Sequence, residues 1–200
     1  MRQSTKNKGN GSAGRPKIRG RMSSIAAVFV QAIIPRRVDK NAQAELYRRF
    51  GISPDECVYC GSEKTDEDHL RPIVKGKQSS GYFHTAENLV PACGTCNQSK
   101  SGADWRKWME GNAVKSPARR NVSGLSERIA KLAAFAGVAQ KPIIAPEEMR
   151  EIVGLELWDR YWSRLAEIGD LMSKAQSDAD EILPRLEREF ERRLSETLSG

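Results

Sequence analysis

The residues of this sequence best suited to metal binding are its four cysteines. They form two C-x-x-C pairs, Cys57 with Cys60 and Cys93 with Cys96. Each C-x-x-C turn directs two thiolates toward one point, and two such turns complete the tetrahedral sulfur environment that Zn²⁺ prefers. A thioredoxin-like redox site uses a single pair, and paired disulfides are typical of small secreted domains. The spacing therefore predicts a structural zinc site.

Side chains suited to hydrolysis lie between and just after these pairs. His69 follows Asp68, Asn88 precedes the second pair, and Asn97 comes directly after Cys96. A histidine is neutral near pH 7 and can accept a proton from water. Carboxylate and amide oxygens are hard ligands, which Mg²⁺ and Mn²⁺ prefer. Held together, such groups could activate water and bind a phosphate through a metal.

The stretch from residue 57 to residue 100 resembles the HNH, or ββα-metal, nuclease family in its zinc-containing form. The family pattern reads C-x-x-C…D-H…N-L-V…C-x-x-C-N-x-x-K. The matching residues are Cys57, Cys60, Asp68, His69, Asn88, Leu89, Val90, Cys93, Cys96, Asn97 and Lys100. Asparagine stands at the third position of the motif, where other members carry histidine, so the sequence is an H-N-N variant.

The resemblance implies a role for each polar residue of the motif. His69 would be the general base acting on water, and Asn88 would brace the loop between two strands and orient the histidine. Asp68 and Asn97 would bind a catalytic Mg²⁺ or Mn²⁺. Lys100 would contact the phosphate or the leaving group. His84, in the spacer, is left open between a substrate or metal contact and simple packing.

The local sequence pattern is consistent with a ββα unit in an α+β fold. Short apolar segments predict strands at residues 68–74 and 88–93, and a helix begins near residue 97. We therefore expect a small ββα-metal core held by a four-cysteine zinc site and surrounded by mostly α-helical flanks. The apolar run at residues 25–34 is too short to cross a membrane and predicts a buried helix or strand.

Two further helices are expected beside this core. One covers residues 41–50, with Asn41 as its N-cap and Gly51 after its last turn. The other covers residues 104–109, where Trp105 and Trp108 share one face. Their spacing favours packing in the core over stacking on bases.

We divide the chain into three parts. Residues 1–22 form a basic flexible tail, residues 23–115 the nuclease domain, and residues 116–200 a helical C-terminal region. The C-terminal region has an amphipathic helical pattern that needs a partner, either the chain's own core or a second copy in a homodimer. Pro184 interrupts this pattern and predicts a break or kink.

The charge distribution favours a polyanionic partner. The net charge is +7, the isoelectric point is near 9.4, and no acidic residue precedes Asp39. A basic tail of this kind can follow the phosphates of double-stranded DNA. The sequence carries no recognisable signal peptide or membrane span, so we expect a cytoplasmic protein without a membrane partner.

These observations predict a metal-dependent DNA endonuclease that hydrolyses phosphodiester bonds. Its biological class would be a restriction-type, mobile-element or defence nuclease. The alternative is a zinc-containing module that binds nucleic acid without cleaving it. The Asp68, His69 and Asn97 set favours the nuclease, because a binding module has no need of a base beside metal ligands.

Overall fold

The computed structural model describes residues 15–138 and 141–199. The chain divides into two compact units, one of residues 24–162 and one that joins the residues before Ser24 with those from Ser163 onward. Most of the expected basic tail lies in residues 1–14, outside the described residues. The first unit contains all four cysteines together with both histidines, and it is the unit that forms the candidate site.

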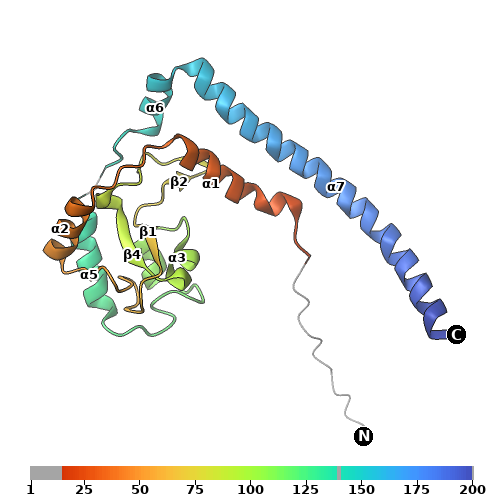
Figure 1. The fold of residues 1–200 in the computed structure, drawn as a ribbon, viewed down its shortest axis with the longest axis horizontal. Helices are drawn as coiled ribbons and strands as arrows, with labels where there is room; N and C mark the ends of the chain where they lie inside the picture. The colour runs from red at the N-terminus through yellow and green to blue at the C-terminus, as the bar shows by residue number, and fades with distance from the viewer. Residues whose placement is uncertain (1–14, 139–140, 200) are drawn as a thin grey trace, which may run out of the picture. The chain divides into compact units, whose positions relative to one another are not determined.

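The centre of this unit is a ββα arrangement, which confirms the α+β fold class. Strand β1 (Asp66–His69) pairs antiparallel with β4 (Leu89–Ala92), with Asp66 opposite Ala92 and His69 opposite Leu89. Helix α3 (Gly94–Lys100) follows β4 directly (Figure 1).

The first strand is displaced from its expected position at residues 68–74. It begins at Asp66 and ends at His69. It ends there because the side chain of Asn88 bonds both the N–H and the carbonyl of Arg71, which removes those groups from strand pairing. Beyond it, β2 (Val74–Lys75) and β3 (Gln78–Ser79) form a separate short hairpin. A short 3-10 turn, η2 (Ala86–Asn88), then leads into β4.

Helix α2 (Lys40–Phe50) occupies the expected segment, but its cap is different. Asp39, rather than Asn41, is the N-cap, and its carboxylate accepts hydrogen bonds from the N–H groups of Asn41 and Ala42. An anionic oxygen at this position accepts hydrogen bonds from otherwise unpaired N–H groups and is attracted to the positive end of the helix dipole. Gly51 ends the helix with φ of 61°, as expected.

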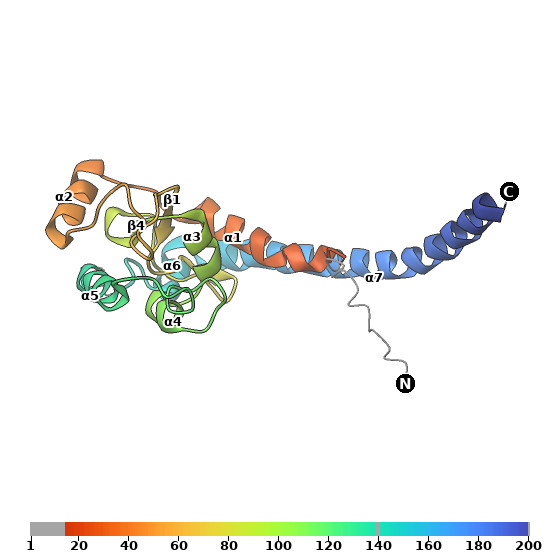
Figure 2. The ribbon, with the colours of Figure 1, turned by 90° about the horizontal axis from the view of Figure 1, so that it is seen from below.

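The main core joins the ββα unit to helices α2, α4 (Trp105–Glu110) and α5 (Leu125–Ala136), which surround it in Figure 2. Trp105 and Trp108 are buried in it, as expected. The buried members include Tyr47, Tyr59, Leu70, Val90, Trp105, Trp108, Met109, Leu132 and Phe135. Helix α5 thus shares this core with the cysteine pairs.

A second apolar cluster lies on helix α1 (Met22–Ile33), which continues from the short 3-10 turn η1 (Ile18–Arg21). Its buried members are Val30, Ile34, Ile73, Phe83 and Met149, the last of these from α6 (Pro146–Val153). The apolar run at residues 25–34 is therefore mostly a helix whose inner face is buried. Of the helix or strand expected there, the helix is the one observed.

Helix α7 (Leu155–Ser199) is uninterrupted, so of the break or kink expected at Pro184 the break is wrong (Figure 1). Proline lacks a backbone N–H, so one hydrogen bond of the helix cannot form at this residue. No helix in the described ranges is long and apolar enough to cross a membrane.

Candidate active site

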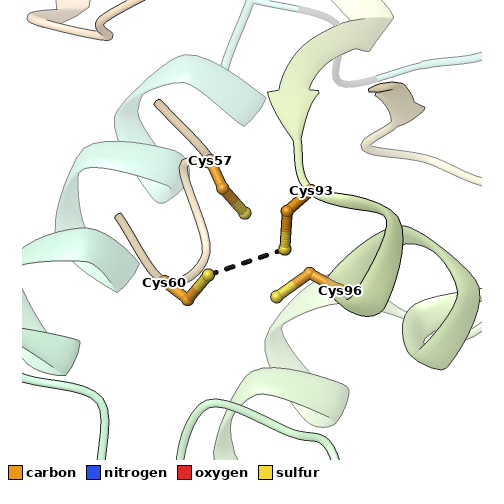
Figure 3. Close-up of side chains that lie close together, drawn as sticks. All are labelled: Cys57, Cys60, Cys93 and Cys96. Carbon is orange, nitrogen blue, oxygen red and sulfur yellow. Dashed lines mark hydrogen bonds between the residues drawn. The ribbon is translucent and has the colours of Figure 1, made fainter. Parts of the chain in front are cut away.

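The four cysteines converge on one point. Cys57 and Cys60 come from the loop before β1, Cys93 follows β4, and Cys96 lies on α3 (Figure 3). Their sulfur atoms all lie within 4.8 Å of one another, and those of Cys60 and Cys93 are 3.7 Å apart. A tetrahedral site with Zn–S bonds of about 2.3 Å places its sulfurs roughly 3.8 Å apart, so the cluster fits zinc.

Two polar side chains contact the sulfurs of the cluster. Arg120 donates from Nη1 to the sulfur of Cys96 at 3.4 Å, and the hydroxyl of Ser62 lies 3.1 Å from the sulfur of Cys60. The hydrogen bond between Cys57 and Cys96 lowers the pKa of Cys57 to about 5 and raises the pKa of Cys96, so these two sulfurs share a proton. Metal ligation requires deprotonated sulfurs, and the guanidinium of Arg120 stabilises a thiolate at Cys96.

Asp68 is buried at the centre of a polar network. Its Oδ2 accepts a hydrogen bond of 2.6 Å from the hydroxyl of Tyr59 and lies 2.9 Å from Nζ of Lys100. Its Oδ1 lies 3.3 Å from the same Nζ. Burial raises the pKa of Asp68, and the neighbouring ammonium of Lys100 opposes that effect.

Lys100 makes contacts different from those expected of it. Its side chain is fully buried, and its ammonium also donates to the carbonyl of His69 at 2.8 Å. A lysine in this position cannot reach a phosphate outside the protein unless it leaves both partners. In this structure it holds Asp68 and the end of β1 in place.

Asn97 lies on the face of α3 that turns toward β1. Its Nδ2 is 3.4 Å from Oδ2 of Asp66, which shares a strand face with Asp68 two residues further on. The helix therefore brings Asn97 into contact with Asp66, the first residue of the strand that carries Asp68. Their oxygens are of the hard type that Mg²⁺ and Mn²⁺ bind.

Within residues 15–138 and 141–199, no other group of three or more His, Cys, Asp or Glu side chains is close enough to share an ion. The described residues therefore hold one cluster of metal-ligating side chains, that of the four cysteines. Both carboxylate oxygens of Asp68 lie close to Nζ of Lys100, at 2.9 and 3.3 Å, so a cation bound by Asp68 would compete with that ammonium.

His69 ends β1 on the opposite strand face from Asp68. Its surroundings favour the neutral ring, because burial lowers its pKa from 6.5 to about 4, with smaller contributions from His84, Lys100 and Arg36. The imidazole is therefore unprotonated at neutral pH, the state that a general base requires.

Asn88 is buried, and its side chain makes three hydrogen bonds to the backbone of the loop between β1 and β4. Its Oδ1 accepts from the N–H of Arg71 at 2.8 Å, and its Nδ2 donates to the carbonyls of Arg71 and Phe83 at 3.0 and 3.1 Å. The backbone carbonyl of Asn88 accepts from the N–H of Leu70. This asparagine thus ties together the segment that follows His69 and the segment that carries His84.

His84, whose role the sequence left open, is in contact with His69. Its Nδ1 lies 3.0 Å from Nε2 of His69. Tyr59, which the sequence analysis did not single out either, binds the carboxylate of Asp68. His84 is 15 positions from His69, and no spacing rule connects residues in a loop of that length. The one available signal is that these are the only two histidines of the chain.

Comparison with known proteins identifies this arrangement. Residues 57–102 match the family model for the HNH endonuclease. This segment belongs to the HNH endonuclease family. The resemblance seen in the sequence is thereby confirmed, and the ββα unit with its four cysteines is the HNH domain of this chain.

A curated relative shares part of the chain. Over 92 residues this chain is 34% identical to that relative, the CRISPR-associated endonuclease Cas9 of Corynebacterium diphtheriae. The match covers 40% of this chain and 8% of that relative, so the similarity concerns one domain of a much larger protein. No solved structure matches the chain.

Proposed function

We propose that this protein is a metal-dependent endonuclease that hydrolyses phosphodiester bonds in double-stranded DNA. The observation that carries the proposal is a neutral, half-buried His69 at the end of the strand that also bears Asp68, within an HNH domain. A base and a hard metal ligand at adjacent positions of β1, with a second hard ligand on α3, suit the hydrolysis of a phosphodiester.

In the proposed reaction, His69 accepts a proton from the attacking water. Its low pKa keeps the ring unprotonated at pH 7, so no prior deprotonation is needed. Asp68 and Asn97 would hold Mg²⁺ or Mn²⁺. When bound, this ion would stabilise the charge that develops on the phosphate and on the leaving 3′ oxygen.

Lys100 and Asn88 are positioning residues in this scheme. Lys100 neutralises Asp68 and holds the carbonyl of His69, so it fixes the strand end from which the base projects. Asn88 fixes the loop that follows the base. Neither residue has to touch the substrate to influence the rate.

Positive charge close to the histidines supports DNA as the substrate. The backbone N–H of Arg37 donates to the carbonyl of His84, so the segment of Arg36 and Arg37 runs beside the site. Arg36 is exposed and near enough to lower the pKa of both histidines. Together with the net charge of +7, this suits a phosphate backbone.

The test is cleavage of supercoiled plasmid by protein that retains its zinc, with and without added Mg²⁺ or Mn²⁺. We expect nicked or linear DNA only with added metal. His69→Ala should lower the rate about 10²- to 10⁴-fold, because the general base is lost. Its DNA affinity, measured by gel shift in Ca²⁺, should match that of the wild type.

Gln78→Ala, on the exposed hairpin, is the control and should cleave normally. Intact plasmid with the wild-type protein in either metal, accompanied by a clear gel shift, would favour the non-cleaving binding module. Cleavage by His69→Ala at the wild-type rate would contradict the assignment of the base.

The biological class that we propose is a restriction-type, mobile-element or defence nuclease. The name of the curated relative, a CRISPR-associated endonuclease, supports the defence alternative. Sequencing of cleaved ends tests the restriction-type alternative: a fixed recognition site would support it, and scattered ends would contradict it.

We also propose a homodimer, because one HNH site per chain cuts one strand at a time. In the second half of α7, apolar side chains spaced four residues apart are exposed: Ile182, Leu186, Phe190 and Leu194. Residues with this spacing lie along one face of a helix, and a second copy could cover them. We expect light scattering to give about 45 kDa, twice the mass of the 22.3 kDa chain.

Phe190→Asp should shift that mass to the monomer and convert linearisation of plasmid into nicking. Glu191→Gln, on the neighbouring face, is its control. A wild-type monomer at micromolar concentration that still linearises plasmid would contradict the dimer.

A further inference from the structure

The two histidines of the chain are in direct contact. Nε2 of His69 lies 3.0 Å from Nδ1 of His84, and the two rings meet edge to face with centroids 5.1 Å apart. The backbone holds His84 in place from both sides. Its carbonyl accepts from the N–H of Arg37, and the carbonyl of the preceding Phe83 accepts from Nδ2 of Asn88.

Two neutral imidazoles joined in this way share one hydrogen, and only two arrangements are possible. In the first, His84 donates from Nδ1–H to the lone pair of Nε2 on His69. The proton of His69 is then on Nδ1, and neither of its nitrogens can accept a proton from water while the contact persists. In the second, His69 donates from Nε2–H, and its Nδ1 keeps a free lone pair.

The distance between the two rings itself requires this sharing. At 3.0 Å, two facing N–H groups or two facing lone pairs would repel, so one ring nitrogen carries the hydrogen and the other accepts it.

We propose that His84 is a positioning residue that accepts a hydrogen bond from Nε2–H of His69 and thereby leaves Nδ1 of His69 as the nitrogen that deprotonates water. This inference rests on the proposed function. In the step itself, a water O–H bond breaks, the proton binds Nδ1 of His69, and the oxygen bonds to phosphorus as the bond to the leaving 3′ oxygen breaks.

His84 contributes twice to that step. Before it, the contact holds the ring of His69 in one tautomer and one orientation. After proton transfer, the imidazolium of His69 still donates from Nε2–H to the lone pair of His84, which stabilises the new positive charge. A carboxylate that accepts from a catalytic histidine acts in the same way in the Ser-His-Asp triad.

The tautomer can be read by NMR without any cleavage assay. Because the chain has two histidines, ¹⁵N labelling of histidine gives four ring nitrogens, which single variants assign. At pH 7, with zinc retained and no Mg²⁺, we expect a protonated Nε2 and an unprotonated Nδ1 for His69. In His84→Leu, His69 should show a mixture of tautomers. An unprotonated Nε2 in the wild-type protein would overturn the proposal.

Kinetics tests the consequence. His84→Leu should lower the cleavage rate about 10- to 100-fold without changing DNA affinity in Ca²⁺, since a group that orients the base acts on the chemical step. His84→Asn places an amide oxygen where Nδ1 lies and should recover most of the lost rate. Thr85→Ala, a neighbour without a side-chain cap hydrogen bond, is the control and should behave as wild type.

A double variant separates positioning from a structural role. In a His69→Ala background, His84→Leu should cause no further loss, because its effect passes through the missing base. An additional loss in that background would indicate a structural role and contradict the proposal. So would an active His84→Leu protein alongside an inactive His69→Ala protein.

The two proposals fail in different ways. A wild-type protein that cleaves no DNA contradicts the nuclease function, while the NMR spectrum still decides the tautomer. If His84→Leu does not fold, the spectrum of the wild type and the rate of His84→Asn still test the inference.

Discussion

The zinc cluster and the histidine site belong to the same ββα unit but are held together in different ways. At the cluster, four sulfurs within 4.8 Å of one another bring like charges together as thiolates. At the histidine site, the polar groups are already paired: Asp68 with Tyr59 and Lys100, and His69 with His84. Thiolates repel one another until a cation joins them, whereas hydrogen-bonded pairs need no ion to persist.

This difference separates the expected roles of the two metals. Zinc at the cysteines would contribute directly to folding, because structural zinc sites stabilise the turns that hold them. A catalytic ion at Asp68 would join a site whose residues other contacts already hold. Removal of zinc should therefore unfold the ββα unit, whereas removal of the catalytic ion should leave it folded.

The largest effect should follow loss of a cysteine. Cys96→Ser replaces a soft ligand by a poor one, and structural zinc sites carry about 10–16 kcal/mol of apparent binding free energy in small domains. We expect loss of zinc and of cooperative unfolding, measured by elemental analysis and by circular dichroism. Thr95→Ala, exposed on the same helix, should keep one zinc per chain.

A purified wild-type protein without zinc, or one whose four cysteines all react freely with a thiol reagent, would contradict the cluster. Removing Mg²⁺ from the wild-type protein should leave its unfolding temperature nearly unchanged. A large decrease on that treatment would remove the distinction between the two regions.

A smaller effect is expected when the buried ion pair is broken. Lys100→Met leaves Asp68 buried without its ammonium partner, and breaking such a pair typically costs about 3–5 kcal/mol. We expect a decrease of that size in the free energy of unfolding, measured with denaturant. Lys107→Met, at an exposed position in α4, should change stability little.

Combining Lys100→Met with Asp68→Asn should recover part of the loss, because no unpaired charge then remains. If the free energy of unfolding of the double variant falls by the sum of the two single effects, the two residues are not coupled.

The smallest effect concerns the brace at Asn88. Asn88→Ala removes three hydrogen bonds and leaves the N–H of Arg71 unpaired. Leaving a buried group unpaired costs about 1–3 kcal/mol, and we expect a decrease of that size in the free energy of unfolding. The cleavage rate should also fall, because the brace ties the segment after His69 to the one that carries His84.

Asn112→Ala, outside the site, is the matched control and should leave both stability and rate unchanged. If Asn88→Ala is destabilised but cleaves at the wild-type rate, the brace supports the fold alone and does not orient the histidines.

Errors in the local predictions have a common cause. The N-cap at Asp39, the end of β1 at His69 and the continuity of α7 through Pro184 all depend on which competing hydrogen bonds form. Residue preferences describe what each segment favours in isolation. They do not say that the side chain of Asn88 binds both polar groups of the Arg71 backbone and so ends the strand.

The sequence by itself determined the four-cysteine cluster and the ββα order, because each depends on neighbours within a few residues or on a fixed motif. Only the tertiary structure decided the partners of Asp68 and His69. Three contacts join segments that are far apart in the sequence: Tyr59 with Asp68, Lys100 with Asp68, and His84 with His69. Their contacts depend on burial and geometry, which arise only when β1, β4 and α3 enclose one core.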